Sequence, residues 1–377
     1  MKQTNTILNT ELLELFQPVT LGNLELSNRI VMAPMTRGFS PNGVPGRNVA
    51  DYYKRRAENS VGLIITEGTL INHPAAAQGL GRPEFHGEEA LEGWKEVVKS
   101  VHEAGGKIVP QLWHVGMARQ ASGDNPNPES LPIGPSGINI MTGEKTSEAM
   151  TKDEIKHIVN AFGQAAGDAK RLGFDGIEIH GAHGYLIDQF FWSNTNKRDD
   201  EYGGDILGRS RFAVEIIEAC RQKVGPDFPI IFRFSQWKLN DYNAKLATTL
   251  EELSEFLTPL VDAGVDIFHC STRRYYEPEF EGSDLNLAAW TKKLTGKPTI
   301  TVGSVGLDST FTEFFTHGTG GKATGFSPLM KSLKTNEFDL VAVGRALLAD
   351  PAWVTKTAAN RIDELIPFEK GVEQTLS

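Results

Sequence analysis

Cysteine is almost absent from this chain of 377 residues. Its two cysteines, Cys220 and Cys270, lie far apart in the sequence and form no C-x-x-C pair. A disulfide framework, a structural zinc site and an iron–sulfur cluster all need several cysteines at close spacing. We therefore expect none of these, and a reducing compartment is the natural setting.

Excess positive charge is also missing, since 48 acidic residues outnumber 38 basic ones and the net charge is −10. Nucleic acids and anionic membrane surfaces select clustered positive charge, so neither is expected as a partner. The first residues, MKQTNTILNTELLELF, contain no continuous apolar run, and no stretch approaches the length that crosses a bilayer. These absences predict a cytoplasmic protein that acts on small molecules, and they do not decide between a monomer and a homo-oligomer.

Short apolar, β-branched runs bounded by Gly and Pro recur along the chain, with helical patterns between them. Such alternation is typical of parallel β/α construction. No G-x-G-x-x-G follows any run, which disfavours a dinucleotide-binding Rossmann domain. The pattern predicts an α/β protein in which residues 1–377 form a single (β/α)8 TIM barrel domain. The eight predicted strands are 29–35, 61–67, 107–113, 174–180, 229–235, 265–271, 299–303 and 338–344.

Helices are expected between these runs. Thr151 with Glu154 three residues later forms a capping box ahead of an apolar stripe, which predicts a helix beginning there. Pro259 predicts a kink or a late start in its helix, because proline cannot donate an intrahelical hydrogen bond. The other predicted helices span 47–59, 88–104, 209–224, 249–263, 284–294 and 346–359.

Three segments depart from plain alternation. Residues 19–26, with a Gly-Asn turn in the middle, predict an N-terminal β-hairpin that caps the barrel floor. The Gly/Pro/Asn/Ser-rich stretch 122–146 is too long for a plain connection, so we expect a lid or capping excursion after strand three. Residues 307–337 form a long insertion between strands seven and eight. The shape of the pocket should depend on 122–146 and on 273–281.

Ligand sites in β/α barrels lie at the carboxyl ends of the strands. Gln, Arg and Thr near one centre suit a planar heteroaromatic ring with several hydrogen-bonding edges. A His pair with a Tyr suits a polar substrate oxygen and a proton. The residues at the predicted strand ends include Pro34, Met35, Thr36, Gly68, Gln111, Trp113, His180, His183, Tyr185, Arg233, Gly303, Ser304, Gly344 and Arg345.

Several ordered motifs share one resemblance. The longest, FDGIEIHGAHGYLIDQF at 174–190, resembles the Old Yellow Enzyme family of FMN-dependent ene-reductases. Because the motifs occur in the family's order across nearly the whole chain, the chain is identified as a member of it. The other motifs are NRIVMAPMTR at 28–37, ITEG at 65–68, QLWH at 111–114, SNTNKRDDEYGG at 193–204, RSRF at 209–212 and VGR at 343–345.

The resemblance implies a tightly bound, non-covalent FMN. Thr36 would bond the flavin C4 carbonyl, Gln111 the pyrimidine edge, and Arg233 the N1 and C2 carbonyl, where negative charge accumulates on reduction. Four residues after strands seven and eight would hold the FMN phosphate, namely Gly303, Ser304, Gly344 and Arg345. The remaining cofactor contacts implied are Pro34, Met35, Gly68 and His180.

The resemblance also implies an NAD(P)H-dependent oxidoreductase that reduces the activated C=C bond of α,β-unsaturated carbonyl or nitro compounds with ping-pong kinetics. His180 and His183 would bond the substrate oxygen, hydride would pass from flavin N5, and Tyr185 would donate the proton. Trp113 and Tyr275 would complete the substrate pocket. The sequence does not choose between NADH and NADPH or name the physiological alkene.

Other interpretations of the same residues remain. His180 and His183 are spaced as metal ligands can be, but no third ligand stands nearby, so no metal is expected. Arg233 could pair with Glu178 inside the barrel. A barrel lyase or isomerase without flavin, with His180 and Tyr185 as acid and base, is the alternative function. A barrel that has lost activity is disfavoured because the full set of residues is present.

Overall fold

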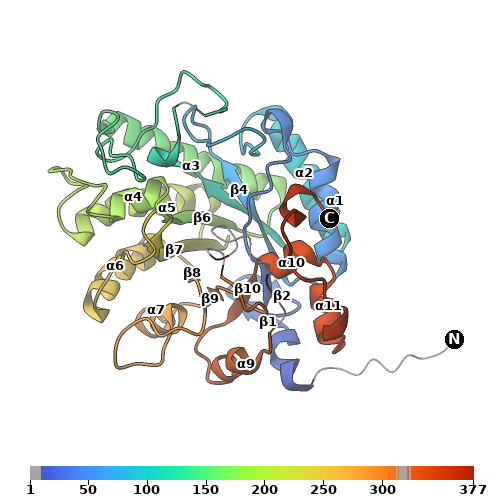
Figure 1. Ribbon diagram of the computed structural model, residues 1–377. Coiled ribbons are helices and arrows are strands. Elements are labelled where there is room, and N and C mark those ends of the chain that lie inside the picture. Colours follow the sequence, from blue (N-terminus) through green and yellow to red (C-terminus); the bar gives the residue numbers. More distant parts are fainter. Residues whose placement is uncertain (1–9, 122, 311–312, 314–320, 322–323) are drawn as a thin grey trace.

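Eight parallel strands close into a barrel in the computed structural model, which describes residues 10–121, 123–310, 313, 321 and 324–377 (Figure 1). Around the barrel the strands follow the order β10-β3-β4-β5-β6-β7-β8-β9, each parallel to its neighbours. The predicted (β/α)8 barrel is therefore confirmed. The strands are β3 (Ile30–Met32), β4 (Leu63–Leu70), β5 (Ile108–Trp113), β6 (Ile177–His183), β7 (Ile230–Lys238), β8 (Ile267–Ser271), β9 (Thr299–Val302) and β10 (Leu340–Val343).

Helices surround the barrel (Figure 1). The predicted capping box begins α3, since the Thr151 side chain accepts from the Glu154 amide and the Glu154 carboxylate accepts from the Thr151 amide. The late start suggested by Pro259 is wrong, because α6 begins at Leu250, directly after the capping residue Thr249. The longer helices are α1 (Arg47–Glu58), α2 (Glu88–Glu103), α3 (Lys152–Leu172), α5 (Ile206–Val224), α6 (Leu250–Ala263) and α7 (Leu287–Thr295).

Shorter helices differ from the sequence-based expectation. The helix expected at 346–359 is two helices, α10 (Arg345–Ala349) and α11 (Trp353–Ala358). Asp350 between them has an extended ψ of 99° because a residue before proline is disfavoured in the α region, and Pro351 follows it. The sequence pattern also misses α4 (Leu186–Phe191) and α9 (Ser327–Lys334). α4 has six residues, fewer than two helical turns, so it is too short to reveal a helical period in the sequence.

None of the helices in the described part of the chain has the length and apolar character that a bilayer span requires.

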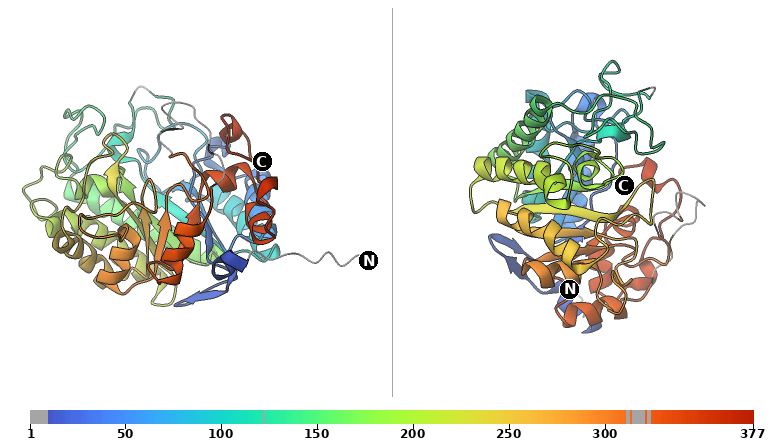
Figure 2. Two further views of the ribbon diagram at one scale, coloured as in Figure 1. Left: turned by 60° about the horizontal axis from the view of Figure 1, so that its bottom comes forward. Right: turned by 90° about the vertical axis from the view of Figure 1, so that its left-hand side faces the viewer.

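The N-terminal hairpin closes the barrel floor, as predicted. Its strands β1 (Val19–Leu21) and β2 (Leu24–Leu26) pair antiparallel. Leu21, Leu24 and Leu26 are buried in one cluster with apolar side chains of the barrel strands. Figure 2 shows the hairpin at one end of the barrel and the long loops at the other. Because the hairpin covers the floor, a ligand approaches the barrel from the carboxyl ends of the strands.

The segment after β5 is an irregular excursion. Ile138 and Lys145 form an isolated bridge within it. Arg198 donates to the Pro135 carbonyl at 2.9 Å, and the Asn240 side chain donates to the Ile140 carbonyl. The excursion is therefore docked against the loops that follow β6 and β7.

Candidate active site

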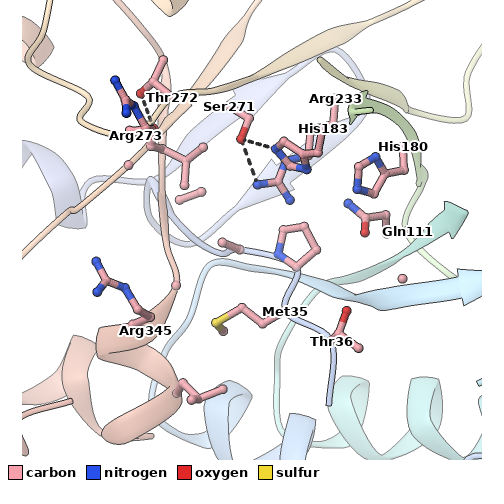
Figure 3. Close-up of a pocket in the computed structure, with 18 of the residues that line it drawn as sticks. Met35, Thr36, Gln111, His180, His183, Arg233, Ser271, Thr272, Arg273 and Arg345 are labelled. Atoms are coloured by element: carbon pink, nitrogen blue, oxygen red, sulfur yellow. Dashed lines mark hydrogen bonds between the residues drawn. The ribbon is translucent and has the colours of Figure 1, made fainter. Parts of the chain in front are cut away.

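A cavity of about 330 Å³ opens at the carboxyl ends of the strands, where barrel enzymes bind their ligands (Figure 3). None of the described residues of 122–146 lines it, so of the two alternatives that the sequence left, the segment is an excursion and not a lid over this cavity. The rim is formed instead by residues from 237–242 and 302–307. Every predicted site residue except Tyr275 lies in the wall: Pro34, Met35, Thr36, Gly68, Gln111, Trp113, His180, His183, Tyr185, Arg233, Gly303, Ser304, Gly344 and Arg345.

Tyr275 is packed in the core instead. Its side chain is buried, its carbonyl accepts from Asn286 Nδ2 at 2.6 Å, and its amide donates to the Gly303 carbonyl at 3.1 Å. Burial raises the pKa of its phenol to about 12. Thr272 and Arg273, the first two residues after β8, line the cavity in place of Tyr275.

His180 and His183 both come from the end of β6, and their rings meet edge to face with centroids 5.1 Å apart (Figure 3). Burial, followed by the charge of Arg233, lowers the pKa of both imidazoles well below 6.5, so both are neutral at pH 7. His180 Nδ1 accepts from the Ala182 amide at 3.3 Å. The proton of His180 is therefore on Nε2, as a hydrogen-bond donor.

Tyr185 follows a left-handed turn at the end of β6. His183 and Gly184 have φ angles of 66° and 79°, and Tyr185 is then the residue before α4. Its ring packs edge-on against Trp113 and His180, with centroids 5.0 Å from each. Burial raises the pKa of its phenol to about 12, so the hydroxyl keeps its proton at neutral pH. No described residue hydrogen-bonds this hydroxyl, which leaves it free for a ligand.

A buried ion pair holds this turn in place. Lys238 Nζ lies 2.6 Å from Asp188 Oδ1, and both side chains are fully buried. Asp188 Oδ2 accepts from the Gly184 amide at 2.6 Å, and the Leu239 amide donates to the His183 carbonyl at 3.2 Å. Burial raises the pKa of Asp188, against the opposing effect of Lys238. Sequence analysis misses the pair because its members belong to different elements and share no local pattern.

Arg233 and Gln111 present polar groups from β7 and β5. Arg233 Nη2 donates to Ser271 Oγ at 3.3 Å, while its Nε is buried with no partner in the described chain. Gln111 Nε2 donates to Glu178 Oε1 at 2.7 Å, which leaves the Gln111 amide oxygen for a ligand. The other carboxylate oxygen of Glu178 lies 2.6 Å from His269 Nδ1. Glu178 therefore orients Gln111, and the direct ion pair with Arg233 considered from the sequence is not formed.

Two glycines allow close approach within the wall. A Cβ at position 68 would lie 2.5 Å from Trp113 Cε3, so any residue other than glycine there would displace the indole. Trp113 Nε1 is buried with no partner in the described chain. Gly303 has a φ of 135°, and a Cβ there would lie 2.6 Å from the Thr272 carbonyl oxygen. Both positions therefore require glycine.

The far end of the cavity is built by the residues after β9 and β10. Ser304 has a φ of 51°, and its hydroxyl lies 3.0 Å from the carbonyl oxygens of Arg273 and Ser309. Arg345 Nη1 donates to Ser309 Oγ at 3.0 Å. Burial lowers the pKa of Arg345 to about 10, so it remains charged at neutral pH. Residues 311–312, 314–320 and 322–323 of the predicted insertion lie outside the described residues.

The rim contains a stack of side chains that the sequence motifs do not reveal. The Trp237 ring stacks on His183 with centroids 4.5 Å apart, and Tyr242 stacks on Trp237 at 5.3 Å. The Arg273 guanidinium carbon lies 5.6 Å from the centre of the Tyr242 ring. Since β7 runs to Lys238, past the predicted end at residue 235, Trp237 falls in the wall.

Comparisons with known proteins point to one family. The model of the NADH:flavin oxidoreductase / NADH oxidase family matches residues 14–364. The NADH oxidase of Thermoanaerobacter brockii is 36% identical over 361 residues, which cover 93% of this chain and 52% of that protein. The NADPH dehydrogenase of Clostridium acetobutylicum is 34% identical over 370 residues, covering 95% of this chain and 99% of the relative.

A solved structure is similar to this chain over nearly its whole length. Morphinone reductase in complex with tetrahydroNAD superposes with a TM-score of 0.79 at 30% identity, covering 95% of this chain and 93% of that one. This chain therefore spans about half the length of the Thermoanaerobacter relative, and nearly the whole of morphinone reductase and of the Clostridium relative.

Proposed function

This chain belongs to the NADH:flavin oxidoreductase / NADH oxidase family, which includes Old Yellow Enzyme and uses FMN with NAD(P)H as reductant, and we propose that it is an ene-reductase. The substrate class is α,β-unsaturated carbonyl or nitro compounds. One observation carries the proposal: two neutral imidazoles, His180 and His183, and one protonated phenol, Tyr185, line a single cavity.

The polar groups of the wall suit the flavin ring. The unpartnered Nε of Arg233 would meet the N1 and C2 carbonyl, where a fixed positive charge stabilises the reduced form. The Gln111 amide oxygen, oriented by Glu178, would accept from N3–H. The Thr36 hydroxyl would donate to the C4 carbonyl, and Pro34, Met35 and Gly68 would contact the ring.

The far end of the cavity suits the FMN phosphate. Phosphate sites in this fold commonly follow strands seven and eight, which are β9 and β10 here. Gly303, Ser304, Gly344 and Arg345 line that end, and Arg345 is charged at neutral pH. We assign these four residues to the phosphate.

His180 and His183 would bind the substrate oxygen. His180 carries its proton on Nε2, because Nδ1 accepts from the Ala182 amide. Neutral imidazole donors draw electron density from the conjugated double bond without adding a charge. The substrate is thereby held with its β-carbon electron-poor and its oxygen fixed.

Tyr185 would supply the proton. FMN, held by the residues assigned above, would supply the redox chemistry, which is the transfer of hydride from NAD(P)H to the β-carbon. The Tyr185 hydroxyl gives its proton to the α-carbon, and water returns a proton to the phenolate, which at a pKa of about 12 is quickly reprotonated. The overall reaction consumes NAD(P)H, one proton and the alkene, and yields NAD(P)+ and the saturated compound.

One cavity would serve both reactants in turn. The carboxamide of a nicotinamide contains a carbonyl oxygen, as the substrate does. His180 and His183 can therefore donate hydrogen bonds to the oxygen of either molecule. Since the two cannot occupy the site together, NAD(P)+ must leave before the alkene enters. The proposed kinetics are therefore ping-pong.

An anaerobic titration of the purified protein tests the proposal. The visible spectrum of bound flavin should bleach on addition of NADH or NADPH and recover on addition of 2-cyclohexenone. Bleaching without recovery by any enone, enal or nitroalkene would contradict the ene-reductase assignment. A colourless protein that takes up no FMN would contradict the flavin as well and would favour the barrel lyase or isomerase.

A further inference from the structure

Positive charge is concentrated in this cavity although the chain carries a net charge of −10. Arginine supplies the charge at four positions in the wall, and one carboxylate, Glu373, opposes it. Such a cavity attracts anions from solution. The four arginines are Arg37, Arg233, Arg273 and Arg345.

Three of these arginines already have partners. Arg37 donates to a backbone carbonyl of the C-terminal segment, and Arg233 donates to the Ser271 hydroxyl. Arg345 donates to groups of residues 309–310 at the phosphate end. The bound FMN phosphate would offset part of the charge that these side chains contribute.

Arg273 differs from the other three. No hydrogen bond or ion pair joins its guanidinium to a residue in the described ranges, and its recorded contact is the face of Tyr242. The neighbouring Arg274 is paired with Glu277 at 3.0 Å, so the nearby carboxylate is already taken. The backbone of Arg273 is nevertheless fixed, since its carbonyl lies 3.0 Å from the Ser304 hydroxyl. A positioned cation therefore lines the cavity, and its donors have no partner among the described residues.

A continuous stack connects this cation to the oxygen site. His183, Trp237, Tyr242 and Arg273 follow one another at 4.5, 5.3 and 5.6 Å, and all four line the cavity. An unsaturated ligand with its oxygen at His183 can lie along the edges of these stacked rings. Its remote end then reaches the guanidinium, whose planar donor set matches a carboxylate or a phosphate.

We propose that Arg273 forms an anionic subsite at the rim, which binds the carboxylate or phosphate of an elongated ligand whose carbonyl lies at His180 and His183. The inference rests on the proposed function, because the carbonyl position comes from it. Two ligands carry this chemistry: an unsaturated substrate with a remote carboxylate, and NAD(P)H with its phosphates. A compact, neutral enone would leave the subsite unused.

The test compares three enals in the oxidation of reduced holoenzyme: cinnamaldehyde, 4-carboxycinnamaldehyde and the methyl ester of the latter. Wild type should favour the carboxylate over the ester in the apparent second-order rate constant. Arg273→Gln should abolish this preference, a change on the order of 10–100-fold for a lost charged hydrogen bond. Arg273→Lys, which keeps the charge, should retain part of it.

A second measurement separates the two sources of the anion. The dissociation constants of NADH and NADPH, from the reductive half-reaction, should rise by a similar factor in Arg273→Gln if the reductant's phosphate uses the subsite. Loss of the carboxylate preference alone identifies the substrate, and a raised NAD(P)H constant alone identifies the reductant. If neither quantity changes, or if FMN affinity alone falls, the proposal is wrong.

Lys293→Gln is the matched control. The Lys293 ammonium also lies over an aromatic ring, 4.8 Å from the Trp290 centroid, but it is on α7 and outside the cavity wall. The Lys293→Gln variant removes one positive charge, as Arg273→Gln does. It should change neither the carboxylate preference nor the dissociation constants of NADH and NADPH. An equal effect in this variant would assign the preference to overall charge and overturn the subsite.

A binding assay keeps the inference separate from catalysis. The oxidised holoenzyme can be titrated with 4-hydroxycinnamate and with its methyl ester, following the flavin spectrum. If wild type reduces no alkene but Arg273→Gln selectively weakens binding of the carboxylate, the proposed function fails and the subsite stands. If alkenes are reduced and the variant binds both ligands as wild type does, with unchanged NAD(P)H constants, the subsite fails alone.

Discussion

The two ends of this barrel are built from opposite chemistry. At the floor, Leu21, Leu24 and Leu26 complete an apolar cluster with the barrel strands. At the carboxyl ends the wall contains buried polar atoms with no partner in the described chain, including Arg233 Nε and Trp113 Nε1. Leaving such atoms unpaired costs free energy, so they persist where a ligand can supply the missing partner. The floor therefore serves stability, while the other end gives up stability at the place where we propose that the cofactor binds.

The cavity wall near Tyr185 combines both features, a functional side chain and firm packing. The turn before Tyr185 has a positive φ at His183, which a non-glycine residue adopts only at a cost in free energy. It is nevertheless held by the fully buried Asp188–Lys238 pair. Part of the functional end is thus as firmly packed as the floor, and variants in each region can separate stability from catalysis.

The largest expected effect is on catalysis. Tyr185→Phe removes the proposed proton donor and keeps the ring that packs on Trp113 and His180. Oxidation of the reduced enzyme by 2-cyclohexenone should slow by about 10²–10⁴-fold, the usual contribution of a general acid. Stopped-flow measurement of both half-reactions is the check, and reduction by nicotinamide should be spared. Equal loss in both half-reactions would exclude Tyr185 as the donor.

The next effect is on stability at the functional end. Lys238→Met leaves the Asp188 carboxylate buried without its cation, and breaking a buried pair from one side costs about 3–5 kcal/mol. Denaturant unfolding of the holoenzyme should show this loss. The double variant Asp188→Leu with Lys238→Met removes both charges and should recover most of it. A loss below about 1 kcal/mol in the single variant would contradict the role given to the pair.

The elements that sequence analysis finds are those whose signal is local. The eight apolar runs, the hairpin at 19–26 and the capping box at Thr151 each depend on neighbouring residues, and the structure confirms them. The helix predicted at 346–359 is helical at both ends but is interrupted, because Pro351 disfavours the α conformation of the residue before it. The helix α4 has six residues, so it is too short for an amphipathic period to mark it.

The site residues also divide into those that a local sequence motif marks and those that depend on contacts between distant elements. Motif residues at strand ends were predicted to converge and do line one cavity, whereas Tyr275 does not. Glu178, which orients Gln111, and the stack of Trp237, Tyr242 and Arg273 depend on contacts between distant elements. A long-range contact leaves no periodicity in the sequence, so three-dimensional coordinates are needed to find it.

A variant at the floor should sharpen the contrast between the two ends. Leu24 is 2% exposed, and Leu24→Ala removes buried apolar surface far from the cavity. The free energy of unfolding should fall by about 2–5 kcal/mol, as for other buried Leu→Ala changes. The rate constants of both half-reactions should stay within about twofold of wild type, since additivity holds for distant sites. A selective loss of enone reduction would contradict the division of roles.

The smallest expected effect is on the pH profile. The pKa values of His180 and His183 lie well below 6.5, and that of Tyr185 is about 12. Raising the pH from 6 to 9 therefore changes the charge of none of the three, and the rate constant for enone reduction should vary by less than about threefold. The variant His183→Asn replaces the imidazole in the cavity wall by a side chain that does not titrate. It should give the same flat pH profile. A decline near pH 6.5 in wild type that is absent in His183→Asn would show that His183 is charged in acid. The oxygen site would then use a cation instead of a neutral imidazole whose Nε2 lies 2.8 Å from Ser271 Oγ.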